Sequence, residues 1–213
     1  MKRILAALLV VLFLTPALIK AQFHLSVGPV TGLNFNVHTG SDVDKTGTGF
    51  GIIFGGVADM RFSKNFALQT TIFFYDGRYG SYSSTGTDYY YGNYTIDNGA
   101  SIAYFSIEPL AKFNIGSGFY MVAGPSLGFN MEGSVEQTYT VQNGRIPSNK
   151  VSLQNMNVRF ELKAGAGMDL PLTKLMTLAP QFTFGYGLTN VQKDVSWKIL
   201  SFQAGCALKF NLI

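Results

Sequence analysis

Residues 103–113 read AYFSIEPLAKF, and their side chains alternate between apolar and polar along the chain. One set of alternate positions is apolar, whereas the other includes Tyr104, Ser106, Glu108 and Lys112. Because successive side chains of an extended chain point to opposite faces, a period of two predicts a β-strand. This strand would have one apolar face and one face that carries charges near its middle.

The same alternation recurs on both sides of this stretch. Strands are predicted at about 23–37, 50–62, 66–76, 100–113, 119–131, 157–170, 175–187 and 197–210. Three short connections (63–65, 114–118 and 171–174) alternate with four longer ones (38–49, 77–99, 132–156 and 188–196). Short turns at one end and long loops at the other are typical of bacterial outer-membrane barrels. We therefore predict an all-β fold, an eight-stranded antiparallel up-and-down transmembrane β-barrel with both termini at the periplasmic end.

The charged residues inside the strands indicate which face points inward. They share the polar face: Asp59, Arg61, Glu108, Lys112, Glu161, Lys163, Asp169 and Lys209. Eight apolar faces rich in Phe would overfill so small a barrel, and a charge facing lipid costs about 2–4 kcal/mol at the bilayer midplane. We expect outer-membrane lipid around the barrel and a closed lumen filled by ion pairs. A narrow pore for ions or small solutes and a soluble exported barrel that binds an apolar ligand remain open as alternatives.

Four prolines lie inside predicted strands, at positions 29, 109, 125 and 180. Each removes a backbone donor from the hydrogen-bond ladder, and a closed barrel has no edge on which to place it. We therefore expect β-bulges at these positions.

Residues 1–21, MKRILAALLVVLFLTPALIKA, have the layout of a secretory signal peptide. Lys2 and Arg3 precede an apolar run, and Pro16 breaks it before small residues. Cleavage is expected after Ala21, with Ala17 as the alternative site, so that 22–213 forms the barrel domain. A membrane anchor is disfavoured because the apolar run is short for a helical span.

Composition argues against several other classes of protein. Charged residues make up 13% of the chain, about half the usual share for a soluble domain. Three of the 16 basic residues, Lys2, Arg3 and Lys20, belong to the leader, so the rest is close to neutral and no nucleic-acid partner is expected. The single cysteine, Cys206, excludes an intrachain disulfide.

Several stretches resemble a known family. They are YFSIEPLAKF at 104–113, AGPSLGF at 123–129, AGAGM at 164–168 and FGYGLTN at 184–190. Together they resemble the small outer-membrane β-barrel proteins called porin family or PorT-like, which are abundant in Bacteroidota. The resemblance implies an integral outer-membrane barrel, although most members lack an assigned activity.

The last strand also looks like the assembly signal that the barrel-insertion machinery reads. The matching residues are Gln203, Gly205, Leu208 and Phe210. The chain departs from the pattern because it continues to Ile213 rather than stopping at Phe210.

No catalytic constellation is visible, so we expect neither an enzyme nor a cofactor. His24 and His38 are the only histidines, which makes a histidine-based triad or metal site implausible. Asp42 and Asp44 have a spacing found in calcium loops but lack the accompanying Gly and distal Glu.

The predicted loop 77–99 is the most distinctive surface feature. It carries Tyr79, Tyr82, Tyr89, Tyr90, Tyr91 and Tyr94 among small polar residues. Tyrosine among Ser, Gly and Asn forms an efficient contact surface, which predicts an extracellular ligand or an envelope protein as partner. Alternatively, these tyrosines belong to extended strands and an interfacial girdle.

Overall fold

The computed structural model describes residues 24–43, 46–88, 92–141 and 144–212. The predicted leader and Tyr89, Tyr90 and Tyr91 lie outside this part of the chain. None of the described residues forms a helix long and apolar enough to cross a membrane. The strands are β1 (His24–Thr39), β2 (Gly47–Arg61), β3 (Phe66–Asp88), β4 (Gly92–Gly116), β5 (Phe119–Val141), β6 (Gly144–Ser152), β7 (Arg159–Met168), β8 (Leu170–Pro171), β9 (Met176–Gly187) and β10 (Lys198–Asn211).

Eight of these strands close into a ring, as the alternation predicts. The order is β1-β2-β3-β4-β5-β7-β9-β10, and β10 pairs with both β9 and β1. All neighbouring strands of the ring are antiparallel. Strand β8 resumes the course of β7 after Asp169, and β6 pairs with β5 outside the ring. The ring is the predicted eight-stranded barrel.

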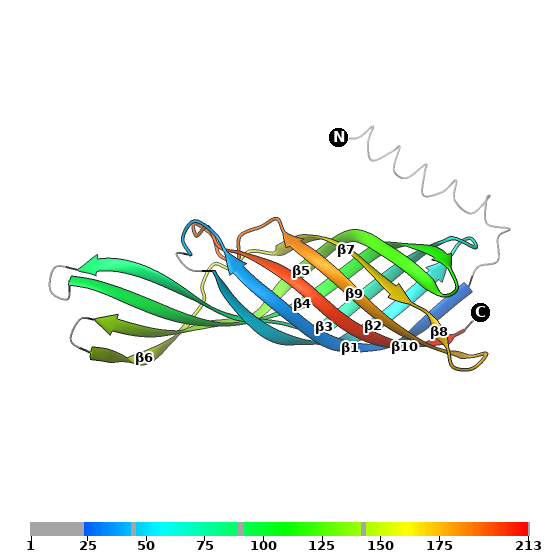
Figure 1. Ribbon diagram of the computed structural model, residues 1–213, viewed down its shortest axis with the longest axis horizontal. Coiled ribbons are helices and arrows are strands. Elements are labelled where there is room, and N and C mark those ends of the chain that lie inside the picture. Colours follow the sequence, from blue (N-terminus) through cyan, green and yellow to red (C-terminus); the bar gives the residue numbers. More distant parts are fainter. Residues whose placement is uncertain (1–23, 44–45, 89–91, 142–143, 213) are drawn as a thin grey trace, which may run out of the picture.

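Strands β3, β4 and β5 continue past the pairing of the ring and, with β6, form a projecting sheet of residues 77–88, 92–103, 132–141 and 144–152, whose base still lies beside β2 at the barrel mouth. Strand β2 pairs with β3 only as far as Asp76, whereas β3 and β4 stay paired up to Asp88 and Gly92. Figure 1 shows this sheet at the opposite end from the start of β1 and the end of β10. The prediction of loops at 77–99 and 132–156 is therefore wrong over most of both ranges. Thr and Tyr favour extended backbone, and the pairing of β3, β4, β5 and β6 with one another continues these segments as strands.

The two faces of the barrel wall have the predicted polarity. Large apolar side chains cover the outside, including Phe50 at 67% and Leu162 at 52% exposure. Charged side chains such as Glu108, Lys112 and Glu161 point inward and are buried. A soluble barrel with an apolar, ligand-binding interior is therefore wrong, because lipid is the solvent that suits this outer surface.

The strand prolines do not produce bulges. Pro109 and Pro125 lie where β4 and β5 have no paired residues, between Ile107↔Leu127 and Ala111↔Ala123, and the register is the same on both sides. Pairing of β1 with β10 pauses in the same way beside Pro29. The missing donors leave gaps in the ladder without an inserted residue, so the expectation of bulges at these positions is wrong.

Candidate functional site: the lumen and the projecting sheet

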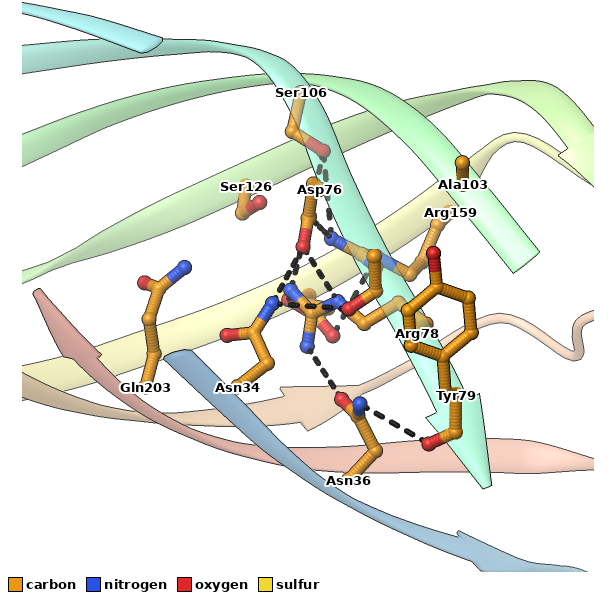
Figure 2. A network of polar contacts seen from close by, with 12 residues as sticks. Asn34, Asn36, Asp76, Arg78, Tyr79, Ala103, Ser106, Ser126, Arg159 and Gln203 are labelled. Atoms are coloured by element: carbon orange, nitrogen blue, oxygen red, sulfur yellow. Dashed lines mark hydrogen bonds and ion pairs between the residues drawn. The ribbon is translucent and has the colours of Figure 1, made fainter. Parts of the chain in front are cut away.

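A buried carboxylate organises the lumen below the projecting sheet. Asp76 accepts hydrogen bonds from Arg78 Nε at 2.8 Å and Arg78 Nη2 at 3.0 Å, and it also binds Arg159. Asn34 and Ser106 donate to the same carboxylate at 2.7 Å and 2.8 Å. Figure 2 shows these side chains converging on Asp76 from several strands. Charge-assisted, bidentate bonds of this kind fix geometry strongly.

The sequence analysis missed Asp76 and Arg78 because a bulge changes the side to which they point. Along β3, Ala67 and Phe73 point inward at odd-numbered positions. The register of β3 then shifts between Phe73 and Asp76 against both neighbouring strands. A bulge inserts one residue and reverses the alternation, so the even-numbered Asp76 and Arg78 enter the lumen instead of facing lipid.

Arg159 was missed for a simpler reason. Arg159 is an even number of residues from Glu161 and Lys163 in the predicted strand, so its side chain lies on the same face. That spacing was sufficient to place it in the lumen. Lys163 binds Glu108 and donates to Gln203 at 3.1 Å, and Arg159 Nε lies 3.5 Å from Glu161. We call the resulting set the sheet-end network: Asp76, Arg78, Glu108, Arg159, Glu161 and Lys163.

A second ion-pair cluster, the terminal-end network, lies toward the chain termini and consists of Asp59, Lys112, Asp169 and Lys209. Lys112 Nζ is 2.6 Å from both carboxylates, and Lys209 Nζ is 3.0 Å from Asp59 and 2.6 Å from Asp169. Of the predicted lumen charges, Arg61 is the outlier. Its side chain is 42% exposed and 3.9 Å from Asp169, at a pocket of about 760 Å³ that opens at this end.

Between the two networks the lumen contains an apolar cluster beside glutamines and threonines, and the prediction of a polar lumen does not include this cluster. Six buried side chains form this middle layer: Val30, Ile53, Val57, Phe73, Ala179 and Ala207. Beside it, Gln69 and Tyr120 donate to Gln181 at 2.8 Å and 3.1 Å. The cavity here is about 30 Å³, enough for about two water molecules. Side chains therefore close the middle of the barrel.

The mouth beneath the projecting sheet is also closed. Trp197 Nε1 donates to His38 Nδ1 at 2.9 Å, and the Tyr82 ring lies 4.9 Å from the Trp197 ring. These residues lie within or beside a buried cluster that includes Val43 and Ile102. Tyr82, predicted as a surface contact, instead packs into this plug, and burial raises the pKa of its phenol.

The remaining predicted contact tyrosines lie on the projecting sheet or outside the described residues. Tyr79 shares a hydrogen bond with Tyr75, and the rings of Tyr94 and Tyr139 are 6.3 Å apart. Tyr89, Tyr90 and Tyr91 are not described. The described tyrosines Tyr79, Tyr82 and Tyr94 thus belong to a sheet rather than to a loop, and each has a different partner.

The two faces of the projecting sheet differ in chemistry. On the face that continues the lumen side, Gln137 donates to Asn98 at 3.1 Å, next to Tyr94 and Tyr139. On the opposite face, Ser83 donates to Asp97 at 2.7 Å among further Ser and Thr side chains. Among the described side chains, the first face carries tyrosines and amides, and the second carries hydroxyl groups together with Asp97, Glu136 and Lys150.

The predicted assembly-signal residues lie along β10. Gln203 is buried in the lumen, whereas Phe210 points outward with 39% exposure. Gly205 and Leu208 lie between them. Their role in assembly stays a prediction. Within the described residues, no group of three or more histidine, cysteine or acidic side chains is placed to hold a metal ion.

A family model described as outer membrane protein beta-barrel domain matches residues 19–193. The chain belongs to this family. Its barrel is therefore an integral barrel of the bacterial outer membrane, in agreement with the closed ring and the apolar outer face. No curated protein matches the sequence.

Solved structures of small outer-membrane barrels are similar to this chain. The attachment invasion locus protein Ail of Yersinia pestis is 13% identical, with a TM-score of 0.40, over 87% of this chain and 98% of Ail. Neisserial surface protein A is 13% identical with a TM-score of 0.37, over 87% and 97%. OprG of Pseudomonas aeruginosa is 9% identical with a TM-score of 0.38, over 89% and 95%.

Proposed function

We propose that the barrel is a closed anchor that holds the projecting sheet outside the cell, with both termini in the periplasm. The sheet serves as the contact surface for an extracellular ligand or an envelope protein, and the lumen neither conducts nor catalyses. The observation that carries this proposal is the closure of the lumen by the sheet-end network, the apolar middle layer and the terminal-end network. A narrow pore would require the sheet-end network, the apolar middle layer and the terminal-end network all to open.

The orientation can be tested by labelling single cysteines in a Cys206→Ser background. Thr140 is exposed on the projecting sheet, and Lys64 is exposed in the turn at the other end. A maleimide attached to a polymer too large to cross the outer membrane should label Thr140→Cys in intact cells and Lys64→Cys only after lysis. The reverse pattern would contradict the proposed orientation.

The separation of anchor and contact surface has its own test. Ser81 pairs with Gly99 and Glu136 with Lys150, so 82–98 and 137–149 can each be replaced by an Asn-Gly turn at matched positions. The shortened chain should still migrate as a heat-modifiable barrel, since the ring of eight strands stays intact. Loss of heat-modifiable migration would show that the sheet is needed for the barrel itself.

We also propose two finer assignments. Residues 1–21 are removed as a signal peptide, which the intact mass of the protein from outer membranes would reveal. Within its family the chain belongs to the PorT-like group of Bacteroidota; the stretches 104–113 and 184–190 support this placement. Grouping with barrels of other phyla in a tree of family sequences would contradict it.

A further inference from the structure

A pocket opens in the outer wall where β5 and β7 separate. Their last paired residues are Gly128 and Arg159; beyond them, β5 continues into the projecting sheet and pairs with β6. The pocket at this fork has a volume of about 510 Å³, within the range of small-molecule sites. Its lining consists of Phe129, Asn130, Leu153, Gln154, Asn155, Met156, Asn157 and Val158. We call it the fork pocket.

The fork pocket is apolar on one side and polar on the other. Phe129 and Val158 are 43% and 51% exposed and belong to the lipid-facing surface of the barrel. Asn155 and Gln154 are exposed in the segment that leads from the projecting sheet back to β7. The pocket therefore lies across the boundary at which acyl chains give way to headgroups.

Hydrogen bonds hold this segment in place, so the pocket is preformed. Asn157 Nδ2 donates to the carbonyl of Asn190 at 3.1 Å, and Leu153 N donates to the carbonyl of Gly133 at 2.9 Å. Lys193 N donates to the carbonyl of Asn155 at 3.1 Å, so the backbone of this exposed lysine lies beside the polar side of the pocket, outside its lining. A preformed site loses little entropy when a ligand binds.

From these features we infer that the fork pocket binds an acylated, phosphorylated glycolipid of the outer leaflet. Acyl chains would continue the lipid contact of Phe129 and Val158, and Lys193 would attract a phosphate. The side-chain amides of Gln154 and Asn155 have no hydrogen-bond partner among the described residues. An amide both donates and accepts, which matches the many sugar hydroxyls and the acyl amides of a glycolipid headgroup. The inference rests on the proposed orientation.

The test uses the folded full-length barrel in detergent and native mass spectrometry, with diphosphorylated lipid A as probe and phosphatidylglycerol as competitor. Val158→Trp fills the apolar side, and Lys193→Glu reverses the rim charge. Their matched controls are Leu162→Trp, equally lipid-facing at 52% exposure on β7, and Lys64→Glu at the other end of the barrel. Heat-modifiable migration verifies that each variant is folded.

One molecule of lipid A should bind to each barrel. The affinity for lipid A should fall about tenfold or more in Val158→Trp and in Lys193→Glu, because each variant loses a well-placed contact. Both controls should bind like the unchanged protein. Equal losses in the controls, or equally tight binding of phosphatidylglycerol, would overturn the inference. If cysteine labelling reverses the orientation, the anchor proposal fails first and the pocket would face the inner leaflet, where a preference for phosphatidylglycerol is expected.

Discussion

The two charged networks of the lumen both consist of ion pairs between basic and acidic side chains, but they differ in their exposure to solvent. The sheet-end network is built on arginines around Asp76, and the side chains of Asp76, Arg78 and Glu161 are fully buried. The terminal-end network is built on lysines and lies beside an open pocket, with Asp169 15% exposed. Because an unpaired charge costs most where water cannot reach it, the burial of each site and the partners that remain there should together rank the effects of mutations.

The largest effect is expected at the centre of the sheet-end network. Asp76→Ala leaves Arg78 and Arg159 with only their longer carboxylate contacts, to Glu161 at 3.6 and 3.5 Å, in a site closed to solvent. The free energy of unfolding should fall by about 3–5 kcal/mol, the usual result of breaking a buried pair. Urea titration of the barrel in lipid vesicles measures this change. Glu132→Ala, at an exposed acid on β5, is the control and should change little.

A smaller effect is expected in the terminal-end network. Lys112→Met removes one ammonium group, but Lys209 still binds both Asp59 and Asp169. The loss should be about 1.5–3 kcal/mol, as for a hydrogen bond to a charged group. The same urea titration compares the two variants directly. A loss as large as that of Asp76→Ala would remove the distinction between the networks.

The smallest effect is expected at Arg61, whose side chain is 42% exposed and 3.9 Å from Asp169. Arg61→Ala should cost less than about 1 kcal/mol, as exposed ion pairs do. The cost should shrink further in high salt because screening weakens exposed pairs. Unfolding at low and high ionic strength tests both points, and a large salt-independent loss would place Arg61 inside the network.

The sequence was sufficient for features that depend on a period of two. Uninterrupted alternation predicts the strands of the ring and the inward direction of Glu108 and Lys163. The short turns follow from where this alternation stops. The same rule could have placed Arg159 inside, and Ile53 and Val57 share the parity of Asp59, so the apolar middle layer was also visible in principle.

Other features could not be read from alternation. The bulge between Phe73 and Asp76 has no distinct residue signature, yet it decides that Asp76 and Arg78 face the lumen. The length of the projecting strands depends on pairing between β3, β4, β5 and β6, which a single stretch of sequence does not encode. Position in the sheet, rather than residue type, determined both outcomes.

The central claim is that side chains close the lumen at the two ion-pair networks, the apolar middle layer and the mouth, and single-channel recording in planar lipid bilayers tests it most directly. The refolded barrel, verified by heat-modifiable migration, should insert without producing steady unitary currents. Reproducible conductance steps of uniform size would contradict the closed-anchor account and favour the narrow pore.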